Sequence, residues 1–127
     1  MNITIKDKNY RLVWGMGAIE IYCDTLECDL DGLAMIEDVS QPLKQLKAML
    51  TIVYAAIKNG CEIDNVECDV TYRQLQEWLD QAEQGTADNI MQDFAQSKIF
   101  GKTLSEYFQT QPEETGKVKK KSASVKS

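Results

Sequence analysis

The four cysteines are the residues of this 127-residue chain with the widest chemical range: Cys23, Cys28, Cys61 and Cys68. Thiolates bind soft metals, form disulfides and act as nucleophiles. The spacings C-x4-C and C-x6-C match no common zinc pattern, and the sequence has no histidine to complete a mixed site. We therefore expect no metal site and no cofactor, and interpret the cysteines as structural or incidental reduced thiols. A metal- or redox-dependent role for them stays open as an alternative.

Other catalytic groups are sparse. Without histidine, the commonest general base is missing. Ser40, Ser97 and Ser105 show no base pattern and no nucleophile elbow. Residues 29–32 resemble the start of a calcium loop, but its twelfth position falls on Ser40 instead of glutamate. The sequence therefore predicts a protein that is not an enzyme and has no catalytic residues.

The composition is that of an ordinary soluble domain, with 43% apolar and 27% charged residues. No window approaches the roughly 20 apolar residues that a membrane span needs. The opening "MNITIKDK" lacks the charged-then-apolar plan of a signal peptide. These features predict a cytoplasmic protein without a membrane partner.

Charge is distributed unevenly along the chain. The net charge is −6, and residues 109–127 carry five lysines and two glutamates, which leaves −9 on residues 1–108. A body this acidic argues against nucleic-acid binding, because phosphate contacts need clustered Lys and Arg. The terminal segment has almost no large apolar residue, which favours disorder. We expect one globular domain over residues 1–108 and a disordered basic tail over 109–127.

The first elements are expected from a change in apolar rhythm. Alternating apolar residues predict a hairpin over residues 3–14, with "DKN" at its turn. After Gly15 the apolar residues recur every three or four, which predicts a helix to Glu27. Gly15 would give the corner its backbone freedom, and Gly17 would allow close approach to the hairpin.

Further helices follow with clear start and stop signals. Pro42 and Gly60 bracket a helix that is apolar around most of its girth, including Leu43 and Leu46, so we expect it at the centre of the core. Thr71 with Gln74 forms a capping box that starts the next helix, and Thr86 restarts one that runs to about residue 100. The expected fold class is α+β, mainly α, with the hairpin packed on a bundle of about four to five helices.

A cluster of apolar residues stands just before the basic tail: Ile99, Phe100, Leu104, Tyr107 and Phe108. Such residues most often close a core. The alternative is a partner-binding patch that accepts an amphipathic helix. We carry them forward as the candidate partner-binding residues.

The order of these motifs resembles the small tail assembly chaperones of long-tailed phages and prophages. The resemblance is carried by "YRLVWGMGAIEIYCDTL", "LTIVYAAIKNG" and "VTYRQLQEWLDQ", and it covers residues 3 to about 100. In that family a hairpin commonly runs into an aromatic-Gly-x-x-Ala helix, here Trp14, Gly15 and Ala18. A later helix begins with Thr and carries an aromatic or apolar pair.

The resemblance implies a non-enzymatic protein that coats the tape measure protein in the host cytoplasm before the tail tube polymerises around it. The tape measure protein would be the main partner, with the tail tube protein as a further one. Two alternatives stay open: a structural tail or head-tail connector subunit, and the cysteine-dependent protein described above. The oligomeric state is not predicted.

Overall fold

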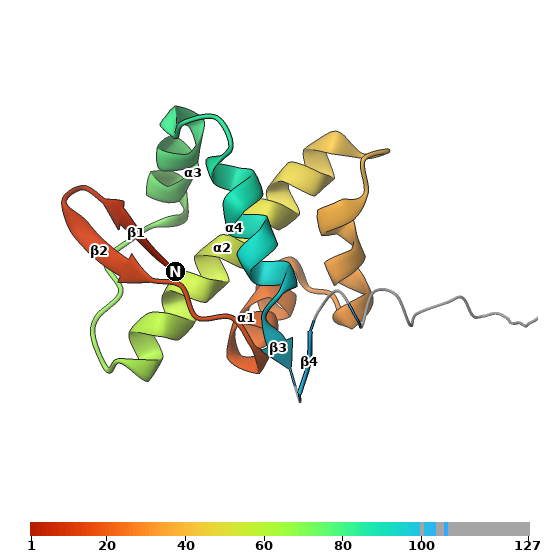
Figure 1. Ribbon diagram of the computed structural model, residues 1–127, viewed down its shortest axis with the longest axis horizontal. Coiled ribbons are helices and arrows are strands. Elements are labelled where there is room, and N and C mark those ends of the chain that lie inside the picture. The colour runs from red at the N-terminus through yellow and green to blue at the C-terminus, as the bar shows by residue number, and fades with distance from the viewer. Residues whose placement is uncertain (100, 104–105, 107–127) are drawn as a thin grey trace, which may run out of the picture. The chain divides into compact units, whose positions relative to one another are not determined.

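The computed structural model describes residues 1–99, 101–103 and 106, and the chain divides into two compact units, Met1–Phe94 and Ala95–Ser127. Its fold class is the expected one, α+β and mainly α (Figure 1). The predicted boundary after residue 108 and the predicted tail over 109–127 lie outside the described residues.

The elements follow one another along the chain with short connections. In order they are β1 (Asn2–Ile5), β2 (Lys8–Arg11), α1 (Met16–Leu26), the 3-10 helix η1 (Leu30–Glu37), α2 (Pro42–Ile63), α3 (Tyr72–Gln81), α4 (Thr86–Ala95), β3 (Lys98–Ile99) and β4 (Lys102–Thr103). The strands pair as two separate antiparallel hairpins, β1 with β2 and β3 with β4.

The first hairpin turns earlier than predicted. Ile3 pairs with Tyr10, and the two loop residues Lys6 and Asp7 both have positive φ, 52° and 66°. Such two-residue loops match the right-handed twist of the strands. The prediction of a turn at residues 7–9 was wrong by about one residue. The alternating apolar residues of the hairpin are buried at Ile3, Ile5, Tyr10 and Leu12, whereas Trp14 at its end is half-buried.

The hairpin lies against α2 at Gly60, which was wrongly predicted to end that helix. A Cβ added at Gly60 would overlap the carbonyl oxygen of Arg11, so the strand passes directly over this glycine. The backbone N–H of Val13 donates to the carbonyl of Ala56, 3.2 Å away. The helix continues to Ile63 because Gly60 serves this close approach and not a helix stop.

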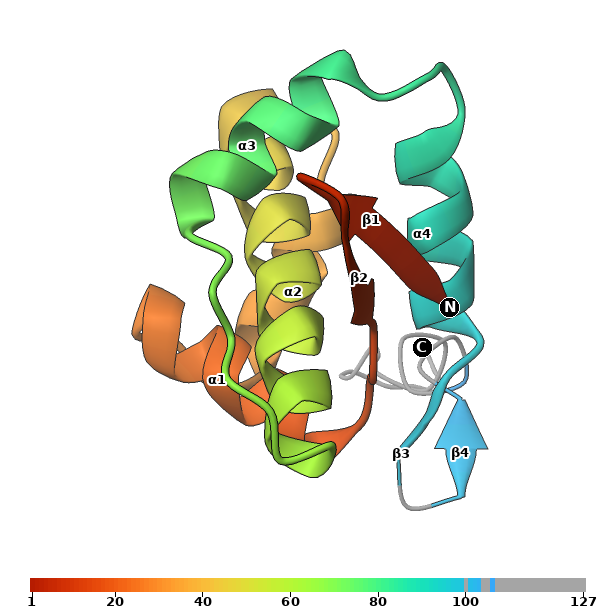
Figure 2. The ribbon, with the colours of Figure 1, turned by 90° about the vertical axis from the view of Figure 1, so that its left-hand side faces the viewer.

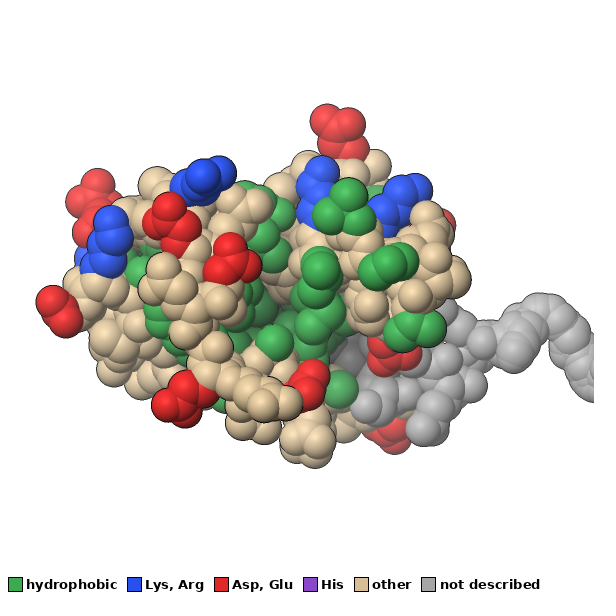
Figure 3. Space-filling model, turned by 90° about the horizontal axis from the view of Figure 1, so that it is seen from above, with side chains coloured by type: hydrophobic (Ala, Val, Ile, Leu, Met, Phe, Trp, Pro, Cys, Tyr) green, Lys and Arg blue, Asp and Glu red, His purple; other side chains and the backbone are tan. Residues whose placement is uncertain are grey.

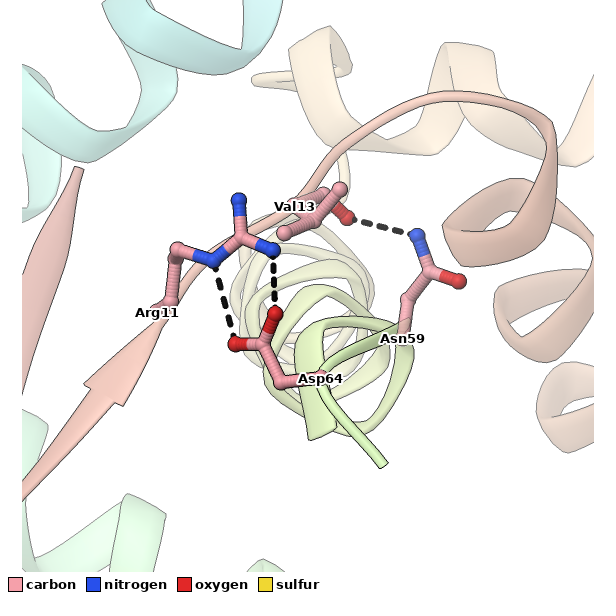
Figure 4. A network of polar contacts seen from close by, with 4 residues as sticks. All are labelled: Arg11, Val13, Asn59 and Asp64. Atoms are coloured by element: carbon pink, nitrogen blue, oxygen red, sulfur yellow. Dashed lines mark hydrogen bonds and ion pairs between the residues drawn. The ribbon is translucent and has the colours of Figure 1, made fainter. Parts of the chain in front are cut away.

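Asn59 locks the strand-to-helix corner onto α2 (Figure 4). Its side-chain amide, Nδ2, donates to the carbonyl of Val13 at 3.0 Å. A Cβ on Gly17 would overlap the Asn59 side chain, so Gly17 allows approach to α2 and not, as predicted, to the hairpin. One turn later the Arg11 guanidinium holds the Asp64 carboxylate by two bonds, 2.6 and 3.1 Å long.

The predicted helix after the hairpin is confirmed as α1, with Gly15 and Glu27 as its caps. Gly15 has φ 109°, a conformation that favours glycine. Tyr22 is fully buried, and its hydroxyl donates to the carbonyl of Gly32 at 2.7 Å, which ties α1 to η1. Met16, expected on the buried stripe, is exposed instead because it lies in the first turn of α1.

Helix α2 runs through the middle of the first unit (Figures 1 and 2). It contacts α1, η1, β2 and α3, and it is the longest helix of the described residues. Its 22 residues span about 33 Å, whereas α1 has 11 and α3 has 10. The first turn of α2 is held to η1, since the side-chain amide of Gln45 donates to the carbonyl of Ile36 at 3.1 Å. The prediction that Leu43 and Leu46 are core residues was wrong, because both are exposed.

Helices α3 and α4 begin where predicted. The capping box of Thr71 and Gln74 is present in both directions, and α4 starts at Thr86. In α3, all of which the structure describes, the one buried residue is Leu75, and the other apolar residues of the helix, Tyr72, Trp78 and Leu79, are half-buried. Helix α4 ends at Ala95, and the predicted continuation to residue 100 was wrong: β3 follows it.

Candidate functional site

Exposed leucines mark one end of α2. Leu43 is 79% exposed and Leu46 is 62% exposed. They are followed by Leu50 and Val53, so the four residues recur at spacings of three, four and three and share one helix face. The face passes from exposed to buried along the helix, since Leu50 and Val53 are buried. This apolar stripe begins outside the core and leads into it.

The stripe forms the floor of a groove of about 640 Å³ between α2, α3 and α4. Figure 3 shows hydrophobic side chains gathered along this hollow. Its apolar lining is Leu43, Leu46, Met49, Leu50, Val53, Tyr72, Leu79, Ala87, Ile90 and Met91. We call this surface the α2–α4 groove. Its volume lies within the range of about 300–1,000 Å³ that is usual for ligand sites.

Tyr72 fixes the α3 wall of the groove against α2. Its hydroxyl lies 3.1 Å from the hydroxyl of Thr51, which in turn donates to the carbonyl of Lys47 at 2.7 Å. The Tyr72 ring packs edge-on against Tyr54 with centroids 5.6 Å apart. Thr51 is buried and was expected on the polar line of the helix; its hydroxyl is satisfied by these two bonds.

Trp14 holds the α4 wall in place from the strand-to-helix corner. Its ring lies 5.1 Å from that of Phe94, centroid to centroid, and its indole N–H donates to Asp93 at 2.7 Å. Both contacts lie at the end of α4, and Ile90 on the same helix is buried beside the groove. The aromatic residue of the Trp14-Gly15-x-x-Ala18 motif is therefore a support of the scaffold.

The groove walls carry opposite charges. Lys47 lines the α2 side, while α3 contributes Arg73, Glu77 and Asp80. Arg73 and Glu77 are 3.9 Å apart and both strongly exposed, so their pairing adds little to stability. Glu77 and Asp80 nevertheless give the α3 wall two carboxylates against one guanidinium, so this wall carries a net negative charge.

The groove offers a surface for binding and few groups for catalysis. Its lining residues include no cysteine, serine or histidine. The apolar floor can bury side chains of a ligand, and the charged walls can orient it. Recognition of an amphipathic helix by such a groove is a recurring mode of peptide binding.

Of the residues predicted to bind a partner, the structure describes Ile99, which lies in β3 and is 7% exposed. Phe100, Leu104, Tyr107 and Phe108 lie outside the described residues. Partner binding by this set stays a prediction. The groove itself was missed, because the apolar pattern of a helix does not show which of its residues the packed unit leaves exposed.

Comparisons of this chain with known protein families, curated proteins and solved structures gave no match. In the part of the chain that the structure describes, no group of three or more Cys, Asp or Glu side chains is placed to hold a metal ion. A search of the same residues found no helix with the length and hydropathy of a membrane span.

Proposed function

We propose that this protein is a non-enzymatic tail assembly chaperone of a long-tailed phage or prophage. It binds the tape measure protein in the cytoplasm of the bacterial host during tail morphogenesis. The proposal joins the motif order of residues 3 to about 100 with one structural observation, the α2–α4 groove with its exposed leucines.

The groove is the main support for the proposal because its floor is apolar. Exposing apolar side chains to water does not stabilise a monomer. Leu43 and Leu46 present their side chains to solvent at the open end of a groove that is otherwise continuous with the core. Exposed apolar surface arranged in this way is typical of binding sites. Two or three side chains from one face of a partner helix would cover it.

The net charge of the chain suits a chaperone that keeps another protein in solution. A long helical protein with exposed apolar stripes aggregates before it assembles, and a bound partner with high net charge keeps it in solution. Residues 1–108 carry a net charge of −9. When this acidic protein covers an apolar stripe, a surface prone to aggregation is replaced by a negatively charged surface that repels other copies of the complex.

The partner helix should carry its own charge pattern. Glu77 and Asp80 on the α3 wall favour Lys or Arg along one border of its apolar stripe, and Lys47 on the α2 wall favours Asp or Glu along the other. Because these charges are exposed, they set orientation and association rate more than affinity.

Co-expression with the tape measure protein tests the proposal. The wild-type chain should raise the soluble fraction of the tape measure protein, and the double variant Leu43→Asp, Leu46→Asp should not. Val39 is 79% exposed and Ile63 is 58% exposed, and neither lines the groove. The matched control Val39→Asp, Ile63→Asp should therefore retain the activity.

Mass spectrometry of purified virions separates this role from that of a virion subunit. A chaperone is displaced during assembly and should be absent from the particle, whereas a tail or connector subunit is retained. A tape measure protein that stays equally soluble without this chain would contradict the proposal.

A further inference from the structure

The first turns of α2 are themselves a helix of the kind that the α2–α4 groove accepts. The apolar stripe recurs at spacings of three, four and three, the pattern by which one helix packs along another. Its first two residues, Leu43 and Leu46, are 79% and 62% exposed. Pro42 begins the helix, and the bond from Gln45 to the carbonyl of Ile36 holds its first turns in place. These turns are therefore already ordered and would lose little conformational entropy on docking.

Lysines border the stripe on one side. Lys44 and Lys47 are both exposed and, together with Thr51, recur at spacings of three and four along a second line of the helix. The hydroxyl of Thr51 lies 3.1 Å from the hydroxyl of Tyr72, which belongs to α3. The lysine border of α2 therefore lies on the side where α3 packs.

The α3 wall carries the complementary charge. Glu77 and Asp80 are exposed on this wall, and they outnumber Arg73. A docked helix is favoured when its lysines run along the border nearest to α3. When two α2 helices face each other in antiparallel directions about a two-fold axis, the lysine border of each lies on the α3 side of the other. A parallel pair would place that border on the opposite side.

We propose that a second copy of this chain occupies the α2–α4 groove when no other protein is bound, in an antiparallel two-fold dimer. Each copy lays Leu43 and Leu46 in the groove of the other, and its two lysines meet the two carboxylates on the other's α3. Such an interface uses the same patch on both subunits, so the exposed leucines of both copies are buried together. The dimer closes the groove to which the proposed function assigns the partner helix, and partner binding would then require that one copy be displaced.

Sedimentation velocity of the full chain, at about 10 to 500 μM, tests the self-association, because an interface of this small size gives a weak dimer. The wild type should pass from monomer to dimer and no further, since a two-fold interface is closed. Each substitution occurs twice in the dimer, so Leu43→Asp, Leu46→Asp should weaken it by at least about 100-fold. The control Ile63→Asp, Val66→Asp changes residues 58% and 57% exposed at and just beyond the other end of α2, and it should dimerise as the wild type does.

Charge reversal tests the reciprocal arrangement. One variant is Lys44→Glu, Lys47→Glu, and the other is Glu77→Lys, Asp80→Lys. Each alone should dimerise about tenfold more weakly, because like charges then face one another across the interface. Mixed in equal amounts, the two should form a mixed dimer with about the wild-type affinity, since opposite charges again meet on both sides. The second variant brings the net charge of −6 nearer to zero, so general repulsion cannot explain its loss of affinity.

Three results would overturn the proposal: a wild-type chain that stays monomeric, growth beyond a dimer, or a mixture of the charge variants that regains no affinity. Unchanged dimerisation by the Leu43→Asp, Leu46→Asp variant would place the interface elsewhere and overturn it as well. Circular dichroism checks that each variant is folded. These samples contain no partner, so the outcome is separate from whether the chain binds a tape measure protein.

Discussion

Replacing Gly60 by alanine tests how the hairpin is joined to the central helix. Alanine is the better helix former by about 1 kcal/mol, so in an open helix interior the substitution would stabilise the protein. At this position the added methyl group would overlap the carbonyl oxygen of Arg11 and lie 3.3 Å from both its carbonyl carbon and Cγ2 of Val13. The neighbouring atom is backbone, which cannot turn away as a flexible side chain can.

The strand must therefore move away from α2. Forced overpacking of this kind costs roughly 1–3 kcal/mol. The move also strains the Val13–Ala56 backbone hydrogen bond, 3.2 Å long, and the Asn59–Val13 bond, 3.0 Å long. Setting these costs against the gain in helix propensity, we expect a net loss of about 1–2 kcal/mol in the free energy of unfolding.

Urea unfolding followed by circular dichroism measures this loss as a lower midpoint with an unchanged slope. A substitution at Lys58 to alanine, two residues away at a partly exposed position of α2, serves as the control. The sign of the change in the free energy of unfolding tests whether β2 lies directly against Gly60. A Gly60→Ala protein more stable than wild type would refute the close approach of β2 to α2.

Three further predictions concern the packing of the helices and of the first hairpin and can be checked by the same unfolding measurement. Leu75→Ala should cost roughly 2–5 kcal/mol, because Leu75 is wholly buried in α3. Trp14→Phe keeps a ring beside Phe94 but removes the hydrogen bond to Asp93, so it should cost about 1–2 kcal/mol. Asp64→Asn should destabilise at neutral pH; because the hydrogen bonds from Arg11 lower the pKa of Asp64, this difference should vanish as the pH falls from about 3.9 through the lowered value.

Local signals in the sequence predicted where helices begin. The capping box at Thr71 and Gln74 involves side chain and backbone of one short segment, so it forms regardless of the tertiary fold. Gly15 at the strand-to-helix corner is a similar case, since its positive φ is a property of one residue. Such features can be found in a sequence because the interactions that produce them are local.

Gly60 shows why other features could not be found. Near the end of an apolar helix a glycine usually marks the stop, and nothing nearby in the sequence indicates that a strand some fifty residues earlier crosses it. The β3–β4 turn is a second case, because residues 96–100 continue an apolar spacing that suits a helix. Contacts distant in sequence decided the outcome at Gly60, whereas the β3–β4 pairing, with Gly101 at φ 86° between the strands, is a local feature that the apolar spacing did not reveal.

The groove depends on the relative lengths of three helices. The apolar pattern of α2 predicted a helix buried around most of its girth, but it could not predict that Leu43 and Leu46 are exposed while Thr51 is buried. Burial is a property of the packed unit and not of the helix. A binding site is therefore hardest to predict where the apolar pattern of a core helix continues onto the protein surface.

The most direct test of the proposed function is the affinity of the protein for helical segments of the tape measure protein. Fluorescence anisotropy with labelled segments should give saturable binding by the wild type. Loss of the two exposed apolar contacts at the open end of the groove should weaken binding by a factor of about 10–100 in the Leu43→Asp, Leu46→Asp variant. The Val39→Asp, Ile63→Asp control, equally charged and similarly exposed, should bind as the wild type does. Equal affinities for all three proteins, or no binding by the wild type, would contradict the assignment of the α2–α4 groove as the partner site.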